Sequence, residues 1–421
     1  MFKQYRLKND LRVLLAPLKE TKAVTVLVLV KVGSRYEPKQ INGASHFVEH
    51  LMFKGTEKRP TSLDITKKLD GIGASYNAFT SKDHTGYYVK CSRDKIELAL
   101  DVLSDIVFNS KFDTDEIERE RGVIVEEINM YEDAPMMMID DVFEGAVFGR
   151  VPLGRSIAGP KEVIKRITRK QLYGYYREHY QPRNMLIAVA GNYDYSVRRL
   201  IRAYFGGSRV RQRKASFRKV AITQRQPRVS LKRKETEQAH LALGFPAYSY
   251  TQRQLYALYA LAVVLGGNMS SRLFMSIRER KGLCYYIRTD VGIYEDTGTF
   301  AVFAGLDKSR IREAIREIVK ELKNIRDGGI TAQELKKAKD FLRGKLILDL
   351  EASDSVASWL GKQALLKGTV LTAAEQLRRV RAVTMADVRR AAREVIQERR
   401  CSLSLIGPFK NERTFRPLLK M

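Results

Sequence analysis

The chain carries one pattern twice, first as ITRKQLYGYYREHYQPRNMLIAVAGN (residues 167–192) and, 216 residues later, as VTMADVRRAAREVIQERRCSLSLIGP (residues 383–408). Each copy predicts an amphipathic helix with a threonine cap, then a short turn, then an apolar strand that ends at a glycine. The capping residues Thr168 and Thr384 align with each other. The repeat therefore predicts a duplicated domain.

The same offset relates the beginnings of the two halves. VTVLVLVKVGS (24–34) predicts a buried strand before a helix, and HLALGFPAYS (240–249) likewise precedes the apolar run QLYALYALAVVLGG. A pair of strands follows in each half, over 75–91 and over 284–306. Strands mixed with long helices, and few regular βαβ units, predict an α+β fold. We expect two homologous domains, each a mainly antiparallel sheet with helices packed on one face.

The length of 421 residues exceeds what one ordinary core covers, so two or more domains are expected. We place the first domain at 1–207 and the second at 231–421. The residues between them, 208–230, read as a basic linker, because the stretch after Tyr204 is rich in Gly, Ser and charge.

Composition gives indications of location. The three cysteines (Cys91, Cys284, Cys401) are scattered without paired spacing, which suits a reducing compartment. The longest apolar run, VTVLVLV, is too short to span a bilayer, and MFKQYRLKND lacks the features of a signal peptide. We therefore expect a cytoplasmic protein that does not contact the membrane.

The net charge of +28 raises the question of a polyanionic partner, and no acid interrupts the basic residues between Arg209 and Lys234. Clustered Lys and Arg gain affinity for polyanions by counterion release. However, the patch lacks interleaved aromatics and any helix-turn-helix, zinc-finger or RNP-type pattern. We expect no nucleic-acid partner and keep polyanion binding as an alternative function.

Two of the five histidines stand in HFVEH (46–50), inside an apolar stretch. On a helix over 43–54, His46, Glu49 and His50 share one side. Two histidines one turn apart can direct ring nitrogens at one metal ion, and zinc is the ion favoured by such a pair with a carboxylate. The alternative is a pair of hydrogen-bonded histidines on a half-buried helix.

Catalytic zinc takes three protein ligands and leaves one position for water, whose pKa the metal lowers to about 7. Glu49 need not bind the metal and is the candidate general base. The third ligand is expected from FDTDEIERERGVIVEEINMYED (112–133), where Glu120 and Glu127 share a helix face. We choose Glu127 as ligand and Glu120 as an acid that orients the site. Glu126, about 100° round the helix, is the nearest competitor.

The second half lacks these groups. A shift of 216 residues lays HFVEH over AVVLG (262–266), and it lays Glu120 and Glu127 over Lys336 and Arg343. This pattern indicates a duplicated domain of which one copy performs the chemistry.

The segment HFVEHLMFKGT (46–56), preceded by GSRYEP (33–38), resembles the insulysin/pitrilysin family of inverzincin zinc metallopeptidases. The similarity is closest to short bacterial processing peptidases akin to the β subunit of mitochondrial processing peptidase. It extends nearly end to end, through the segments SYNAFTSKDHTGYY, ERERGVIVEE, PLGRSIAGP, HYQPRNMLIAVAGN and LGGNMSSRLFMSIRERKGLCYYI.

The resemblance implies the roles of the first-half residues. One zinc ion per chain would be bound by His46, His50 and Glu127. Glu49 would be the base and Glu120 an accessory acid.

The resemblance also implies substrate contacts. Asn77, Ala78 and Phe79 lie where the family's edge strand pairs with an extended peptide. The Arg and Tyr in RERKGLCY correspond to Arg278 and Tyr285, and such a pair can stabilise a developing oxyanion. Tyr286 replaces Tyr285 if the register slips by one; without the resemblance, Arg278 reads as a surface charge and Tyr285 as a core residue of a strand.

The family encloses a chamber with four α+β domains, and this chain supplies two. The resemblance therefore implies a homodimer in which the zinc of one copy faces Arg278 and Tyr285 of the other. We expect a zinc metalloendopeptidase that hydrolyses short unfolded peptides by metal-activated water. Family members that cleave basic presequences have an acidic interior, whereas this chain is basic, so a charge-lined chamber would favour acidic peptides. The alternatives are a catalytically silent peptide-binding or scaffold member, or the polyanion-binding protein.

Overall fold

The structure, a computed structural model, describes residues 2–207 and 215–421. The chain forms two compact units, each assembled from three segments. Unit 1 comprises Met1–Asn129, Arg155–Arg218 and Ile347–Thr372, and unit 2 comprises Met130–Gly154, Lys219–Leu346 and Ala373–Met421. Residues 208–214, which begin the expected linker, lie outside the described residues. The domain boundaries at 207 and 231 stay a prediction.

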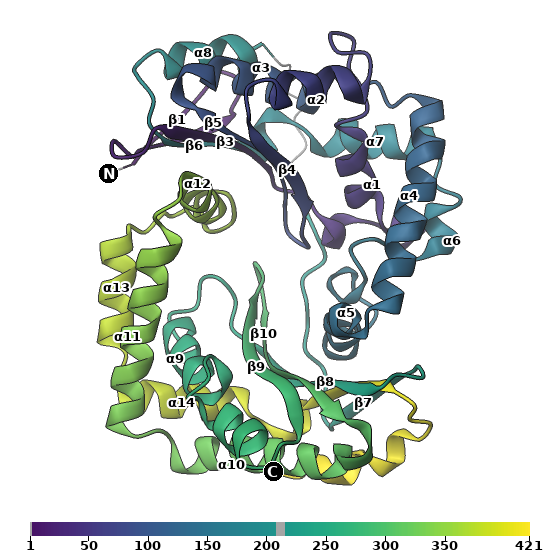
Figure 1. The fold of residues 1–421 in the computed structure, drawn as a ribbon, viewed down its shortest axis with the longest axis vertical. Helices are drawn as coiled ribbons and strands as arrows, with labels where there is room; N and C mark the ends of the chain where they lie inside the picture. Colours follow the sequence, from purple (N-terminus) through teal and green to yellow (C-terminus); the bar gives the residue numbers. More distant parts are fainter. Residues whose placement is uncertain (1, 208–214) are drawn as a thin grey trace. The chain divides into compact units, whose positions relative to one another are not determined.

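Unit 1 is built on a six-stranded sheet (Figure 1). In spatial order its strands are β1 (Lys3–Arg6), β2 (Arg12–Pro17), β6 (Met185–Gly191), β3 (Ala23–Val30), β5 (Thr85–Ser92) and β4 (Ser75–Thr80). β2 and β6 run parallel, and the other neighbouring pairs run antiparallel. The predicted strand at residues 24–30 is confirmed as β3, and the predicted pair over 75–91 is confirmed as β4 and β5.

Unit 2 is built on a five-stranded sheet with the same order, without a counterpart of β1. Its strands are β7 (Arg228–Arg233), β11 (Ser402–Gly407), β8 (Gln238–Ala247), β10 (Gly298–Asp307) and β9 (Cys284–Ile293). β11 and β7 run parallel, as β2 and β6 do, while the remaining pairs are antiparallel. The shared order confirms two homologous domains, each with a mainly antiparallel sheet.

Helices accompany the strands in both halves of the chain. Those of the first half are α1 (Ala44–Leu51), α2 (Ser62–Asp70), α3 (Ile96–Asn109), α4 (Thr114–Asp133), α5 (Pro135–Phe148), α6 (Lys161–Ile164), α7 (Arg169–His179) and α8 (Val197–Phe205). Those of the second half are α9 (Leu255–Gly266), α10 (Ile311–Gly328), α11 (Ala332–Asp349), α12 (Ser353–Lys362), α13 (Ala373–Ala382) and α14 (Met385–Val395).

The repeat that predicts the duplication forms α7 with β6 and α14 with β11. Thr168 caps α7 by accepting a hydrogen bond from the backbone N–H of Gln171, and the Gln171 side chain accepts one in return. Thr384 and Asp387 form the same reciprocal cap on α14. Both threonine caps are confirmed, and such a cap is worth about 1 kcal/mol to a helix.

In unit 1, α3 and α8 cover one face of the sheet, and α12 lies against the other face (Figure 1). Two polar contacts tie this helix region to the strands. Thr25 Oγ1 lies 2.8 Å from Ser353 Oγ, and Arg12 Nη1 donates to the carbonyl oxygen of Ala364 across 2.8 Å. A helix from the second half of the sequence therefore completes the unit that contains β4 and α1.

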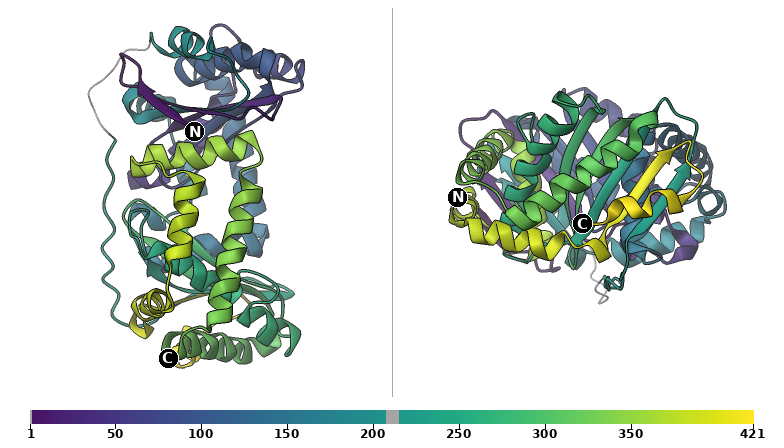
Figure 2. Two further views of the ribbon diagram at one scale, coloured as in Figure 1. Left: turned by 90° about the vertical axis from the view of Figure 1, so that its left-hand side faces the viewer. Right: turned by 90° about the horizontal axis from the view of Figure 1, so that it is seen from below.

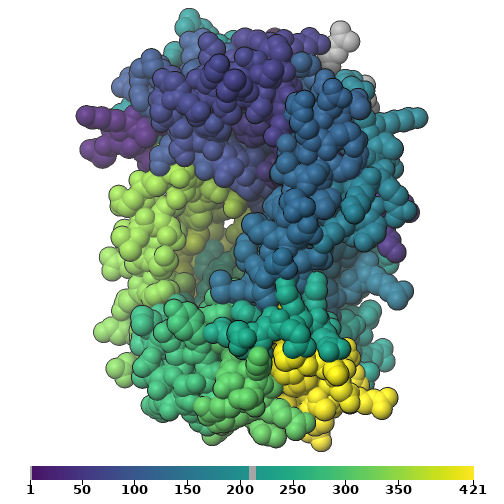
Figure 3. Space-filling model, turned by 45° about the vertical axis from the view of Figure 1, so that its right-hand side comes forward, coloured from purple at the N-terminus to yellow at the C-terminus, as the bar shows by residue number. Residues whose placement is uncertain are grey.

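In unit 2, α10 lies across one face of the sheet, where the right-hand view of Figure 2 shows it in green. The other face receives α5 from the first half of the sequence. Ile139 and Phe143 of α5 are buried against it, and the Phe143 ring meets Phe303 edge to face with centroids 5.9 Å apart. Residues after β11 reach the surface of this unit (yellow in Figure 3), while Phe415 and Leu419 among them are buried in its core.

The structure also bears on the predictions from composition. None of the described helices combines the length and apolarity needed to cross a bilayer. All three cysteines are free, and Cys91 and Cys401 are buried.

Candidate metal centre

Helix α1, which carries HFVEH, is shorter than the predicted span of 43–54. It begins at Ala44 because Gly43 has φ +102°, a left-handed conformation that helical residues do not adopt. A Cβ at Gly43 would also lie 2.6 Å from the carbonyl oxygen of Ala158. The helix ends at Leu51.

The N-terminus of α1 is held by Glu37. The buried Glu37 carboxylate accepts hydrogen bonds from the backbone N–H groups of Gly43 and Ser45, each at 2.7 Å, and from Asn42 Nδ2 at 2.8 Å. Burial raises the pKa of Glu37, although these three donors oppose the shift. This role of Glu37 was not predicted. The signal that could have identified it is an acid a few residues before an expected helix start.

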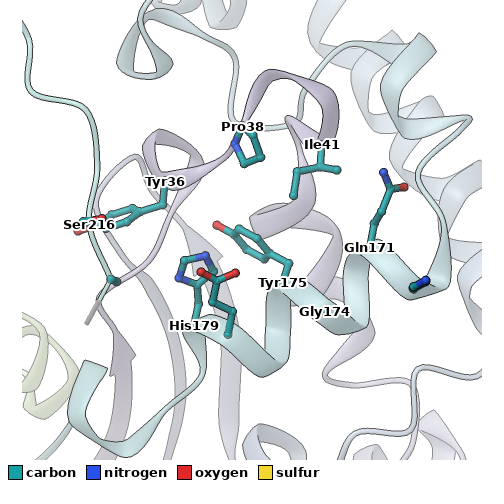
Figure 4. A pocket seen from close by; sticks show the side chains of 11 residues that line it. Tyr36, Pro38, Ile41, Gln171, Gly174, Tyr175, His179 and Ser216 are labelled. Carbon is teal, nitrogen blue, oxygen red and sulfur yellow. The ribbon is translucent and has the colours of Figure 1, made fainter. Parts of the chain in front are cut away.

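Helix α7 packs against α1. The Tyr175 hydroxyl lies 2.8 Å from Ser45 Oγ, next to the first histidine of the motif. Tyr175 and His179 line a pocket of about 420 Å³, together with Tyr36 (Figure 4). The rings of Tyr175 and His179 pack with centroids 4.4 Å apart. This pocket includes none of the predicted site residues, and we assign the chemistry elsewhere.

His46, His50 and Glu127 converge at one point, where their ligand atoms all lie within 4.8 Å of one another. Glu127 Oε2 lies 3.4 Å from His46 Nε2 and 3.5 Å from His50 Nε2. Both distances exceed an ordinary hydrogen bond. Zinc bonds of about 2.0–2.1 Å to tetrahedral ligands would separate those ligands by roughly 3.3 Å, which is close to both distances from Glu127 to the histidines.

Helix α4 supplies both acids of the site. Glu127 and Glu120 are two turns apart on the side that meets α1, as predicted. Glu126 is exposed to solvent. The geometry therefore favours Glu127 over Glu126 as a third ligand.

Glu120 orients His50 from outside the proposed ligand set. Its Oε2 lies 3.0 Å from His50 Nδ1, and its Oε1 lies 2.6 Å from Lys54 Nζ. Burial raises the pKa of Glu120, but hydrogen bonds from His50 and Lys54 outweigh burial and lower it. An anionic Glu120 fixes the Nδ1–H tautomer of His50 and leaves Nε2 to face Glu127. Lys54 was not predicted, although it lies within the quoted HLMFKGT segment.

The two histidines have opposite protonation tendencies. Burial lowers the pKa of His46 to about 4, and the neighbouring His50 adds to this effect. Burial also disfavours the charged form of His50, but its hydrogen bond with Glu120 and the nearby Glu127 carboxylate raise its pKa to about 9. The Nδ1 atom of His46 is buried and has no hydrogen-bond partner among the described residues. His50 therefore carries a proton at neutral pH, which a bound cation would displace.

Glu49 lies between the histidines on α1 but is engaged elsewhere. Thr80 Oγ1 donates a hydrogen bond to Glu49 Oε2 across 2.6 Å. Burial raises the pKa of Glu49, while the Thr80 hydrogen bond opposes that shift. A carboxylate that is easily protonated and lies outside the ligand triad has the properties of a general base. Thr80 itself was not predicted.

The three residues expected to bind peptide lie on β4, which is an edge strand of the first sheet. Ala78 donates its backbone N–H to Asn77 Oδ1 across 2.8 Å, so this N–H lies on the free edge. Phe79 is half-buried and follows directly. An unpaired edge of this kind can accept an extended chain as an additional strand.

Arg278 and Tyr285 lie together in unit 2. Arg278 belongs to the π-helical turn Phe274–Glu279, and its guanidinium carbon lies 5.6 Å from the ring centroid of Tyr285. Tyr285 is 73% exposed, so it is not a core residue of its strand. Tyr286, the alternative, instead directs its hydroxyl to within 3.3 Å of His240 Nδ1. The predicted Arg278 and Tyr285 thus lie side by side, and their role in catalysis stays a prediction.

Two protein-family models match the sequence. The model for insulinase, peptidase family M16, matches residues 12–161, and the model for the peptidase M16 inactive domain matches residues 166–342.

Similar proteins cover almost the whole chain. A zinc protease of Bacillus subtilis, YmxG, is 37% identical over 412 residues, which are 98% of this chain and 99% of that protein. The mitochondrial-processing peptidase subunit beta of Dictyostelium discoideum is 31% identical over 92% of this chain and 85% of that protein. The crystal structure of a protease from Helicobacter pylori matches with a TM-score of 0.90 and 25% identity, covering 97% of this chain and 99% of that one.

Proposed function

Because the chain belongs to the insulinase family of peptidases, family M16, we propose that it is a zinc-dependent endopeptidase that hydrolyses short unfolded peptides. The observation that carries the proposal is the spacing of His46, His50 and Glu127 as ligands of one ion. Two imidazoles and one carboxylate form a donor set that zinc favours in catalytic sites. We propose one zinc ion per chain.

When bound, zinc at this site would supply the Lewis acidity that lowers the pKa of water and polarises a carbonyl. Glu49 accepts a proton from the attacking water and passes it to the nitrogen of the leaving amine. The water oxygen adds to the carbonyl carbon to give a tetrahedral intermediate, and the carbon–nitrogen bond breaks when this intermediate collapses and the amine leaves with the proton from Glu49. Thr80 orients the Glu49 carboxylate for both transfers, and Glu120 holds His50 in place.

The substrate backbone pairs with β4 at Ala78, flanked by Asn77 and Phe79. Binding through backbone hydrogen bonds accepts many sequences but requires an extended chain, so folded substrates are excluded. This preference for extended segments is the reason we propose short unfolded peptides as substrates.

Arg278 and Tyr285 would stabilise the oxyanion of the tetrahedral intermediate. We propose that they act on the zinc site of a second copy in a homodimer. We also propose residues 1–207 as the catalytic domain and 231–421 as the homologous domain that supplies this pair. Free cysteines suit our further proposal of a cytoplasmic location.

A complementation experiment tests the homodimer. Glu49→Gln and Arg278→Ala chains, each inactive alone, are mixed under conditions that exchange subunits. One of the two sites in the mixed dimer would combine an intact zinc site with an intact Arg278, so activity should return. If mixed dimers form but activity does not return, Arg278 does not act across subunits.

The proposed activity is tested with an internally quenched peptide library. The wild-type protein should cleave members of the library, and removal of zinc by a chelator should abolish cleavage. Glu49→Gln should keep its zinc and lose activity by at least 10²-fold, about the contribution of a general base. Glu126→Gln, which changes an exposed neighbour of Glu127, serves as the matched control and should retain activity. A zinc-loaded wild-type protein that cleaves no library member would instead support the silent peptide-binding alternative.

A further inference from the structure

Side chains of β4 alternate between the two faces of the first sheet. Thr80 points to α1, where it meets Glu49, whereas Phe79 points to α12 on the opposite face. Alternation is a property of any strand, so a peptide added to β4 must also direct every second side chain toward α12. On this face, therefore, the protein can contact side chains of a bound peptide and select among them.

The Phe79 ring is fixed in position on this face. It lies over Gly86 of the neighbouring strand β5, where a Cβ would come within 2.3 Å of the ring atom Cζ. The His84 ring packs against Phe79 edge to face, with centroids 5.8 Å apart. The ring thus has a defined place beside the free edge of the sheet.

Lys362, at the end of α12, lies over this ring. Its Nζ is 5.3 Å from the ring centroid of Phe79, within the range of a cation–π contact. Among the described residues, no carboxylate pairs with Lys362, although it is half-buried. Burial lowers the pKa of Lys362. In contrast, Lys90 of β5 pairs with Asp354 of the same helix at 2.8 Å.

His84 also lies near Lys362, but it carries no charge that could balance the ammonium group. His84 is 5% exposed, and neither of its ring nitrogens has a hydrogen-bond partner among the described residues. Burial, with the nearby Lys362, lowers the pKa of His84 to about 3, so this ring is neutral. A half-desolvated ammonium group without a counter-ion is stabilised when an anion binds beside it.

We propose that Lys362 is a specificity-determining residue that selects a peptide with an acidic side chain, Asp or Glu, at the position opposite Phe79. In an antiparallel addition, Phe79 occupies the non-hydrogen-bonded pair, because the free-edge backbone groups belong to Ala78. Opposed side chains in such a pair have Cβ atoms about 4.5–5.5 Å apart and lie on the same face. A carboxylate there comes within reach of Lys362. This inference deepens the proposed function and rests on it.

The experiment compares two quenched peptides that differ only by Glu or Gln, with the position moved stepwise along the sequence. For the wild-type protein, kcat/KM should favour Glu at one position by about tenfold, the size of one hydrogen bond between charged groups. Lys362→Gln should remove this preference, and Lys362→Glu should reverse it. Lys90→Gln, which alters a paired lysine at the same helix–sheet contact, is the control and should keep the wild-type ratio. A Glu preference that survives in Lys362→Gln, or its absence in the wild type, overturns the inference.

Binding separates this inference from the proposed activity. The same peptide pair is measured by fluorescence anisotropy with Glu49→Gln and with the double variant Glu49→Gln/Lys362→Gln. Preferential binding of the Glu peptide should be present in the first and absent in the second. If this holds while the wild type hydrolyses neither peptide, the proposed activity fails but the role of Lys362 stands. Equal binding of the two peptides by Glu49→Gln contradicts the role of Lys362, whatever the activity.

Discussion

Thr80 Oγ1 donates a hydrogen bond to Glu49 Oε2 across 2.6 Å, which joins the edge strand β4 to the helix that carries the histidines. The proposed general base is thus oriented by the strand that we propose binds the peptide. A peptide that shifts β4 would also shift the carboxylate that activates water, which couples substrate binding to the chemistry.

Removal of this hydrogen bond should move the pH dependence of cleavage. Burial raises the pKa of Glu49, and Thr80 holds it down. In Thr80→Val the pKa of Glu49 should therefore rise, because the hydrogen bond that favours the ionised carboxylate is lost. Since the base must be deprotonated, the acidic limb of the kcat/KM profile should shift to higher pH. Thr80→Ser, which keeps the hydroxyl, should leave the limb in place; the same shift in both variants would contradict this role.

The contact between Glu120 and His50 should contribute to metal affinity. Glu120→Gln removes the negative charge that fixes the His50 tautomer, and loss of such a partner costs about 10- to 100-fold in metal affinity. The measurement is a competition titration with a zinc-sensitive dye. Glu118→Gln, an exposed acid on the same helix, should bind zinc as the wild type does. If the two variants bind equally, Glu120 has no part in holding the metal.

Zinc binding should release a proton. The pKa of His50 is about 9 in the apo site, so His50 carries a proton at pH 7, and a metal ligand must be neutral. The pKa of His46 is about 4, so His46 is already neutral at pH 7 and releases no proton when zinc binds. Zinc affinity should fall about tenfold for each unit of pH below 9. Calorimetry in two buffers of different ionisation enthalpy counts the released protons at pH 7, and a count of zero would contradict the assignment.

Glu37 should stabilise the helix that carries the site. In Glu37→Ala the backbone N–H groups of Gly43 and Ser45 lose their acceptor inside the protein, which costs about 1–3 kcal/mol for each unsatisfied buried group. Urea denaturation of the zinc-free protein should show this loss in the free energy of unfolding. Glu57→Ala, which changes an exposed acid nearby, should lie within about 0.5 kcal/mol of the wild type. Equal stability of the two variants would show that Glu37 is not a cap.

Much of the fold follows from local pattern. The Thr-capped helices and the apolar strands of the repeat were predictable because each depends on residues close in sequence. The packing of α5 from the first half of the sequence in unit 2, and of α12 from the second half in unit 1, was not predictable. An amphipathic pattern shows that a helix has a buried face without showing which sheet will cover it.

In the site, too, some features follow from local sequence and others depend on tertiary packing. His46, Glu49 and His50 share a helix, so their proximity follows from spacing alone, and Glu127 required only that α4 lie beside α1. The contacts of Lys54 with Glu120 and of Thr80 with Glu49 depend on tertiary packing, so no local pattern marks them. The position of Lys362 over Phe79 depends on where α12 packs, so it could not be predicted from the sequence either.

The most direct test of the zinc site is the metal content of two neighbouring variants after dialysis against zinc at a fixed free concentration. The wild type and Glu126→Ala should each retain about one zinc ion per chain, because Glu126 is exposed and is not among the residues whose ligand atoms converge. Glu127→Ala should retain almost none at the same free zinc concentration, since it removes one of three ligands. Zinc content in Glu127→Ala equal to that of the wild type would contradict the assignment of His46, His50 and Glu127 as the metal centre.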